Sequence, residues 1–187
     1  MARRPTTPRR PPPPIGAEKL AELALAYVAR FATTRARLAR YLGRKVRERG
    51  WDGPDDAGAV IAALVAKYAD QGFVDDVRFA EARADSLSQR GFGLRRVRQT
   101  LWSDGIAAAD AEPVIDARVD TAWDTAVAFA RRRRVGPFAA ALVTDPKLRA
   151  RHIAAFMRAG HAMSLALRLL AMPPGASLLD EGDADRL

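Results

Sequence analysis

LGRKVRERGW, at residues 42–51, is the first of three related segments that decide the fold of this chain. VRQTLWSDGI follows at residues 97–106 and HIAAFMRAGH at residues 152–161, so that Gly50, Gly105 and Gly160 lie 55 residues apart. In each segment a large side chain stands four and eight positions before the glycine, which is the spacing of one helix face. Glycine favours the left-handed conformation that closes a helix, and the next residue can fold back onto the last turn. The sequence therefore predicts a repeat that is three helices long.

Apolar residues recur at helical spacing between the two tails and predict about nine helices, while no segment shows the alternation of a strand. The predicted repeats cover residues 17–72, 73–119 and 120–172. The predicted fold is all-α, with three tandem three-helix repeats that form an elongated, curved helical array. Helix starts are expected at capping side chains, with Pro113 in the first turn after the last of them. These caps are Thr33 or Thr34, Asp55 or Asp56, Asp75, and Asp110.

The tails differ from the repeats in composition. Residues 1–16 combine six prolines with four arginines, and this composition predicts a disordered basic tail that does not pack. The last helix is expected to end near Met172, before the Pro173-Pro174-Gly175 turn. Residues 173–187 contain four carboxylates and are expected to form an acidic, flexible tail.

The chain has 187 residues, 49% of them hydrophobic, and a net charge of +9 from 31 basic and 22 acidic side chains. Such a balance favours an anionic partner, either nucleic acid or an acidic protein surface. No apolar run reaches the roughly 18 residues that a membrane span needs, and the N-terminus lacks the apolar segment of a secretory signal. The chain has no cysteine, so disulfides are excluded. We expect a cytoplasmic protein that acts as a monomer.

Charge follows the repeat. Residues 30–49 hold eight basic side chains and one acidic one, whereas residues 50–89 hold three basic and eight acidic. The same contrast recurs, because residues 131–168 hold nine basic and one acidic and residues 99–130 hold one basic and six acidic. In a stacked repeat, equivalent helices share a surface, so their arginines are predicted to form a basic stripe that binds protein or DNA. The predicted stripe comprises Arg35, Arg37, Arg40, Arg44, Arg47, Arg95, Arg96, Arg98, Arg149 and Arg151.

Each arginine also has a plainer interpretation, namely a solvated face with intramolecular ion pairs to the acidic helices. For the stripe as a whole, partner binding is the favoured hypothesis. The run Arg131–Arg134 is compatible both with non-specific electrostatic contact and with the preference of a helix end for cations. Most aromatic residues are expected in the core, and only Phe92 and Trp102 stand near enough to a basic stretch to stack on bases.

Nothing in the sequence predicts catalysis, a cofactor or a metal. The Gly91-Phe92-Gly93 turn, expected to be flexible, is not followed by the Gly-Lys-Ser/Thr of a phosphate-binding loop. His152 and His161 are the only histidines, and a metal shared between them is not expected because they are nine positions apart. Asp75 and Asp76 are adjacent at a predicted helix start, where carboxylates usually cap N–H groups. The protein is therefore predicted not to be an enzyme.

Three motifs stand in the central part of the chain: GFVDDVRFA at residues 72–80, RGFGLRRV at residues 90–97 and LWSDGI at residues 101–106. Through them the chain resembles the RecX family of recombination regulators, and the resemblance extends from about Glu22 to Met172. The chain is similar to that family in the order and spacing of these motifs. The residues that match the family pattern, most of which are interpreted as structural, are Asp75, Asp76, Phe79, Gly91, Gly93, Leu101, Gly105 and Ile106.

The resemblance implies three tandem three-helix units and binding in the groove of the RecA–single-stranded DNA filament. It also implies inhibition of strand exchange and ATP turnover, and modulation of the coprotease activity that triggers the SOS response in DNA repair. The alternative from the residues themselves is a stand-alone basic helical protein that binds single-stranded or double-stranded DNA. Steep loss of affinity with salt and indifference to recombinase would distinguish that alternative.

Overall fold

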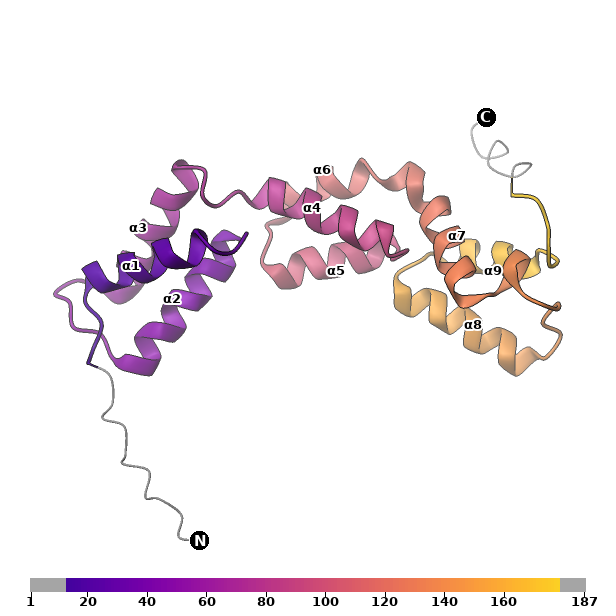
Figure 1. Cartoon of the computed structure of the whole chain (residues 1–187), viewed down its shortest axis with the longest axis horizontal. Helices are drawn as coiled ribbons and strands as arrows, with labels where there is room; N and C mark the ends of the chain where they lie inside the picture. The colour runs from indigo at the N-terminus through magenta and orange to yellow at the C-terminus, as the bar shows by residue number, and fades with distance from the viewer. Residues whose placement is uncertain (1–12, 179–187) are drawn as a thin grey trace, which may run out of the picture. The chain divides into compact units, whose positions relative to one another are not determined.

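The computed structural model describes residues 13–178, which form nine α-helices and two short 3-10 helices, with a single isolated bridge as the only extended pairing in that range. The fold is all-α, as predicted, and the helices follow one another in three groups of three (Figure 1). Contacts divide the chain into two compact units that meet between Asp75 and Asp76. No helix of residues 13–178 is long and apolar enough to cross a membrane.

The first unit holds α1 (Ala17–Val28), α2 (Arg35–Arg49) and α3 (Ala57–Asp70). Its core is built from the apolar faces of these helices, with Leu20, Leu38 and Leu42 fully buried. Two of the predicted caps are confirmed: the Thr34 hydroxyl accepts from the Arg37 amide at 3.1 Å, and the Asp56 carboxylate accepts from the Ala59 amide at 2.8 Å. Removal of such a cap costs about 1 kcal/mol.

One prediction about the N-terminal tail is wrong. Ile15 is fully buried in the core of the first unit, where its amide donates to the Gly50 carbonyl at 3.0 Å and its carbonyl accepts from the Asp52 amide at 3.0 Å. These bonds form the isolated bridge between Ile15 and Trp51. Gly50 accordingly leaves α2 with φ 84° and ψ 160°, an extended exit rather than the left-handed closure that was predicted. The rest of that predicted tail, residues 1–12, lies outside the described residues.

The second unit contains α4 (Asp76–Gln89), α5 (Leu94–Asp104) and α6 (Ala108–Asp116), followed by α7 (Ala122–Arg133), α8 (Pro146–Ala159) and α9 (Met163–Ala171). The 3-10 helices η1 (Val119–Thr121) and η2 (Gly136–Phe138) precede and follow α7. Two apolar clusters fill this unit, one among α4–α6 and one among α7–α9. The Phe92 side chain packs against both clusters and so joins them.

The glycine repeat predicted two of the three helix ends in detail. Gly105 and Gly160 are left-handed, with φ 82° and 93°. The Ile106 amide returns to the Leu101 carbonyl at 3.0 Å and the His161 amide to the Phe156 carbonyl at 3.1 Å, which satisfies carbonyls that the helix leaves open. The predicted helix end near Met172 is also confirmed, because α9 ends at Ala171.

Other local predictions in the second unit are wrong. Asp110 lies inside α6, whose N-cap is Ala107, and Pro113 stands in the interior of that helix rather than in its first turn. Residues 173–178 of the predicted flexible tail pack onto the α7–α9 group, where the Gly175 amide donates to the Pro137 carbonyl at 2.9 Å and the Leu178 side chain contacts the apolar cluster. Residues 179–187 lie outside the described part of the chain.

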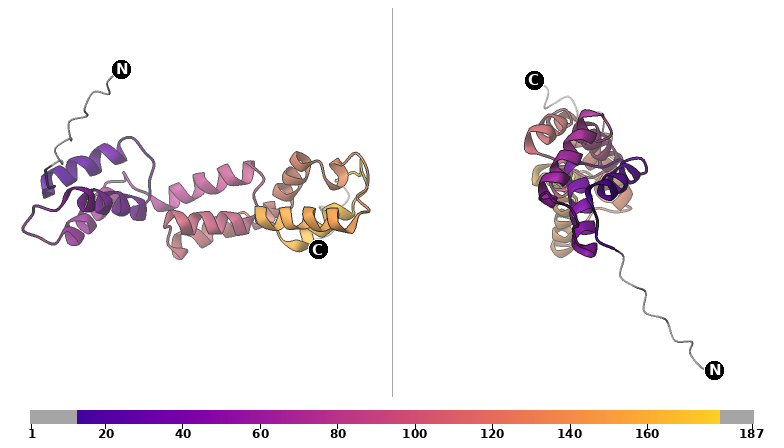
Figure 2. Two further views of the ribbon diagram at one scale, coloured as in Figure 1. Left: turned by 90° about the horizontal axis from the view of Figure 1, so that it is seen from below. Right: turned by 90° about the vertical axis from the view of Figure 1, so that its left-hand side faces the viewer.

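The Gly91-Phe92-Gly93 turn is a packed joint within the second unit, not the flexible turn that was predicted. The Gly93 amide donates to the Ala159 carbonyl at 2.9 Å, and His161 Nε2 lies 3.1 Å from the Gly91 carbonyl. A Cβ on Gly93 would lie 2.6 Å from the His161 amide nitrogen, so only glycine allows this approach. Figures 1 and 2 both show the start of α5 beside the end of α8 at this joint.

Candidate functional site

In the first unit, α2 presents four of its five predicted stripe arginines around one hollow. Arg37, Arg40, Arg44 and Arg47 follow each other at intervals of three or four residues and therefore share one helix face. With Tyr27 from α1 and Tyr41 from α2, they line a hollow of about 390 Å³, which we call the arginine–tyrosine hollow. The structure thus brings these four residues of the predicted stripe together.

Arg35 is separated from that set. Its side chain lines another hollow, with Gly58, Ile61 and Val65 of α3 among its neighbours. The first residue of α2 therefore belongs to a different face from the four arginines that follow it. Arg35 is the one stripe residue of the first unit that lies outside the arginine–tyrosine hollow.

The lining of the arginine–tyrosine hollow consists of four arginines and two tyrosines. Glu48 is the neighbouring acid: it accepts from Lys45 Nζ at 2.8 Å and lies 3.5 Å from Arg44 Nε. The hydrogen bond from Lys45 lowers the pKa of the Glu48 carboxyl, and the charges of Lys45, Arg44 and Arg47 act in the same direction. These pairs are exposed, so they contribute little to stability and leave α2 strongly cationic.

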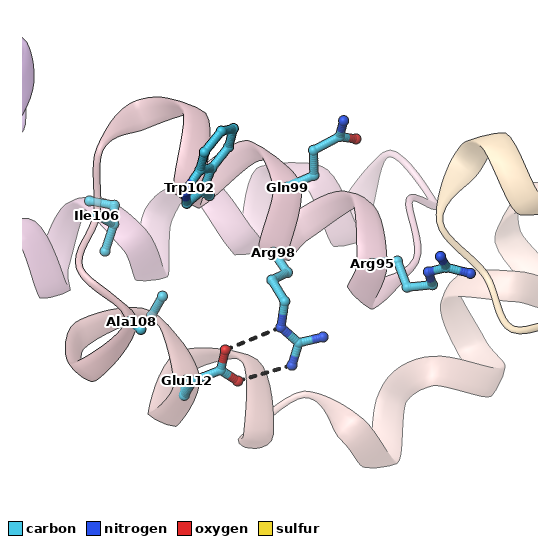
Figure 3. Close-up of a pocket in the computed structure, with 8 residues that line it drawn as sticks. Arg95, Arg98, Gln99, Trp102, Ile106, Ala108 and Glu112 are labelled. Carbon is cyan, nitrogen blue, oxygen red and sulfur yellow. Dashed lines mark hydrogen bonds and ion pairs between the residues drawn. The ribbon is translucent and has the colours of Figure 1, made fainter.

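In the second unit, Arg95 and Arg98 line a hollow of about 420 Å³ between α5 and α6 (Figure 3). Its floor is apolar and includes Ile106, Ala108 and Ala111. Trp102, on α5, stands at its edge with 78% of its surface exposed (Figure 3). This α5–α6 hollow combines an exposed tryptophan with arginine, two residue types that dominate the energetics of binding surfaces.

Arg98 follows the plainer interpretation, because it forms an intramolecular pair. Its Nε and Nη2 donate to the two Glu112 oxygens at 3.2 and 2.9 Å, as a bidentate pair (Figure 3). The hydrogen bond to Glu112 raises the pKa of Arg98 and lowers that of Glu112. The pair connects α5 to α6 across the hollow, and both side chains form part of its lining.

Arg95 and Arg96 stand in the first turn of α5, after Leu94, at the joint with α8. Arg96 Nη1 donates to Gln99 Oε1 at 3.2 Å, and the Arg95 amide donates to the Gly160 carbonyl at 3.2 Å. Both side chains are exposed.

The stripe residues of α8 do not share one surface feature. Arg149 lines a hollow of about 450 Å³ with Leu142, Val143 and Ile153, whereas Arg151 is absent from that lining. Two residues apart on a helix point to different sides. Both are exposed.

The run Arg131–Arg134 forms the last turn of α7 and its cap, which agrees with the interpretation as a cationic helix end. Arg131 lies over the Phe138 ring at 5.0 Å, and Arg132 and Arg133 lie over Phe129 at 5.9 and 5.6 Å. All four arginines remain exposed. The run therefore stays available for electrostatic contact as well.

Trp102 is a functional candidate whose exposure was not predicted from the sequence. Only its place beside a basic stretch distinguished it and Phe92 from the other aromatics, although its spacing from Arg95 and Arg98 puts it on their face of the helix. In the structure Phe92 is packed in the joint, whereas Trp102 is exposed. The expectation that most aromatics lie in the core also fails for Phe73, whose surface is half exposed.

The remaining family-motif residues stand in structural places. Gly91, Gly93, Leu101 and Ile106 are buried, and Phe79 packs on the α4–α6 cluster. Asp76 begins α4, and Asp75 precedes it at the boundary of the two units. Among residues 13–178, no three histidine, aspartate or glutamate side chains gather as metal ligands would.

His161 has a purely internal environment. Its ring lies against Phe129 and Phe156, with centroids 5.3 and 5.6 Å away, and its Nε2 hydrogen-bonds the Gly91 carbonyl. Burial lowers its pKa, and the nearby positive charge of Arg132 adds to this effect, while the bond to Gly91 opposes it. His161 therefore belongs to the joint and not to a binding surface.

Comparisons with known proteins agree on one family. The family model described as "RecX, second three-helix domain" matches residues 75–115, which include most of α4–α6. The chain is 34% identical over 160 residues to "Regulatory protein RecX" of Myxococcus xanthus, a match that covers 83% of this chain and 86% of the relative. It is 35% identical over 120 residues to the protein of the same name from Halorhodospira halophila, covering 64% of this chain and 68% of that one.

Solved structures give the same fold. The crystal structure of RecX from Lactobacillus salivarius superposes with a TM-score of 0.60 at 16% identity, and the match covers 82% of this chain and 94% of that one. A second crystal structure, of "regulatory protein RecX", gives the same score and identity over 82% of this chain and 70% of its own.

Proposed function

This chain belongs to the RecX family of regulatory proteins, and from this premise we propose that it binds a RecA-type recombinase filament on single-stranded DNA and inhibits it. The proposed effect covers the recombinase, ATPase and coprotease activities, and the proposed setting is DNA repair and the SOS response. Filament binding, rather than chemistry, is the proposed mode of action.

The observation that carries this proposal is the exposure of arginines on helices whose opposite faces build the core. On α2, Leu38 and Leu42 are fully buried while Arg40 and Arg44 are exposed. On α5, Val97 and Leu101 are fully buried while Arg95 and Arg96 are exposed. Each helix thus has a fixed core face and a cationic outer face that suits carboxylates of a protein or phosphates of DNA.

The α5–α6 hollow supports a protein component in this contact. An exposed tryptophan over an apolar floor is unfavourable in water and becomes favourable when a partner covers it. The apolar cluster among α4–α6 packs the two helices together, so the hollow is preformed. We propose that Trp102 and the apolar floor contact the recombinase, with Arg95 and Arg96 at the edge of the contact.

The test is recombinase ATP hydrolysis on single-stranded DNA, titrated with the full-length chain. Inhibition at a level below one molecule per recombinase protomer is the expected result, because a filament regulator acts on an assembly and not on each free subunit. A parallel titration of bare DNA at several salt concentrations serves as the control.

The alternative function is a stand-alone nucleic-acid-binding protein, which the net charge of +9 favours. In that case the chain leaves ATP hydrolysis unchanged as long as DNA is in excess, and its binding to bare DNA is strong and falls steeply with salt. That pair of results would replace the regulator by a DNA-coating protein.

A further inference from the structure

The arginine–tyrosine hollow of the first unit has a second chemical feature besides its charge. The Tyr27 and Tyr41 rings are stacked, with centroids 4.2 Å apart and an angle of 18° between their planes. Phe31 continues this group, because its ring centroid lies 5.4 Å from that of Tyr27 and 51% of its surface is exposed. The group joins α1 to α2 and ends in an aromatic side chain that faces solvent.

Cations surround this aromatic group. Arg44 and Lys45 lie over the Tyr41 ring at 5.7 and 5.9 Å, and Arg30 lies over the Phe31 ring at 5.4 Å. Positive charge interleaved with exposed aromatic rings is the combination on which single strands bind, since phosphates meet the cations and bases stack on the rings. An acidic protein surface would use the charge and leave the exposed ring without a partner.

The geometry of the arginines fits a chain of phosphates. Arg37 to Arg47 extends over ten residues of α2, or about 15 Å of helix. One strand carries a phosphate about every 3.4 Å along a stacked helix, so this length matches about four nucleotides. Guanidinium groups bind phosphate oxygens with two parallel hydrogen bonds.

We propose that the arginine–tyrosine hollow, together with the adjacent Phe31, is a binding site for single-stranded DNA, in which the four arginines hold phosphates and Phe31 stacks on a base. This inference deepens the proposed function, because the filament contains a single strand. It assigns the strand to the first unit, while the α5–α6 hollow of the second unit takes protein. Its test uses bare DNA, so that it does not depend on a recombinase.

The experiment measures binding of a fluorescent oligothymidylate to the full-length chain by anisotropy, at several salt concentrations. For Arg44→Ala with Arg47→Ala we expect weaker binding and a salt slope that is shallower by about 1.4, since each phosphate contact of a single strand contributes about 0.7. For Phe31→Ala we expect a fivefold to hundredfold weaker binding with the salt slope unchanged, because stacking releases no counterions.

Arg35→Ala is the matched control, because it removes one charge from the same helix but from the face outside the hollow. Arg44→Ala alone must weaken binding more than Arg35→Ala does. Equal losses for these two variants would mean general electrostatic attraction and would overturn the site. Unchanged affinity of Phe31→Ala, or competition by duplex DNA as strong as by a single strand, would overturn base stacking.

The failure of this inference and that of the proposed function are distinguishable. If the oligonucleotide binds as expected while recombinase ATP hydrolysis is unaffected, the site stands and the regulatory function falls. If ATP hydrolysis is inhibited and the Phe31→Ala and Arg44→Ala variants bind the oligonucleotide like the parent, the regulator stands and this site falls. Helical content by circular dichroism checks that each variant is folded.

Discussion

Replacement of Trp102 by alanine tests the protein-binding role of the α5–α6 hollow. Because 78% of the Trp102 surface is exposed, folding covers only about a fifth of a side chain of about 250 Å². The expected loss of unfolding free energy is therefore about 1–2 kcal/mol at most. Trp102→Ala should fold like the parent chain.

The expected effect on the filament is much larger. Roughly 190 Å² of the Trp102 surface remains for a partner to cover, which corresponds to a ceiling of about 5 kcal/mol. Ordering of side chains and incomplete coverage reduce this, and a central tryptophan typically contributes about 2–3 kcal/mol. The apparent Kd for the filament should rise about 30- to 150-fold.

The assay is inhibition of recombinase ATP hydrolysis on single-stranded DNA, with Trp102→Ala and a control variant titrated side by side. Val119→Ala is a suitable control, since Val119 is a half-exposed apolar residue of the second unit that lies outside the hollow. A Trp102→Ala curve that coincides with that of Val119→Ala, at equal helical content, would refute the assignment of the hollow to the recombinase.

Three further outcomes are expected. Gly160→Ala should destabilise the second unit by about 2–4 kcal/mol in urea unfolding, because the new Cβ would lie 2.6 Å from the Arg96 Cβ at a φ of +93°. Gly175→Ala, at a φ of +78° in open space, should cost only about 1–2 kcal/mol. Equal losses for the two variants would contradict the close packing of the joint. Because the pKa of His161 is lowered in the folded state, the unfolded chain binds more protons, and the free energy of unfolding should fall as the pH drops below about 6.5. His161→Gln should flatten that decline. Identical pH profiles of stability for the parent and the variant would contradict this. Charge reversal by Arg95→Glu with Arg96→Glu should weaken filament inhibition at unchanged helical content, and inhibition equal to that of the parent would remove the start of α5 from the contact.

The sequence predicted the helices well because their signals are local. A glycine that follows apolar residues at helical spacing is visible within one or two turns, and this signal placed the ends of α5 and α8 correctly. The burial of Ile15 was missed because the signal is not local: the surrounding prolines indicate an unpacked chain, and the partners of Ile15 are Gly50 and Asp52. Asp110 was missed as an interior residue because α6 begins at Ala108 without a capping side chain.

The candidate sites show the same division between local and distant information. Arg37, Arg40, Arg44 and Arg47 share a face because of their helical spacing, but the predicted stripe also included Arg35, which lines a different hollow. The sequence could not predict that Arg98 is bound to Glu112, because that pair depends on how α5 packs against α6. The exposure of Trp102 had a local signal that was not used, since Trp102 stands seven positions after Arg95 and four after Arg98 and therefore on their face of the helix.

The three repeated glycines stand at equivalent positions of the repeat but make different contacts in the structure. The basic residues near them therefore differ in their surroundings. Gly50 leads into the segment that pairs with Ile15 and closes the first unit. Gly160 packs against the start of α5, so Arg95 and Arg96 are held at the joint by backbone contacts rather than by their charges. The arginines predicted as one stripe thus line several separate hollows, of which the two proposed as binding sites differ in chemistry: one is rich in arginine and aromatic rings, and the other has an apolar floor with an ion pair. Variants in the two sites should accordingly differ in salt dependence, since removal of Arg44 changes the number of phosphate contacts and removal of Trp102 does not.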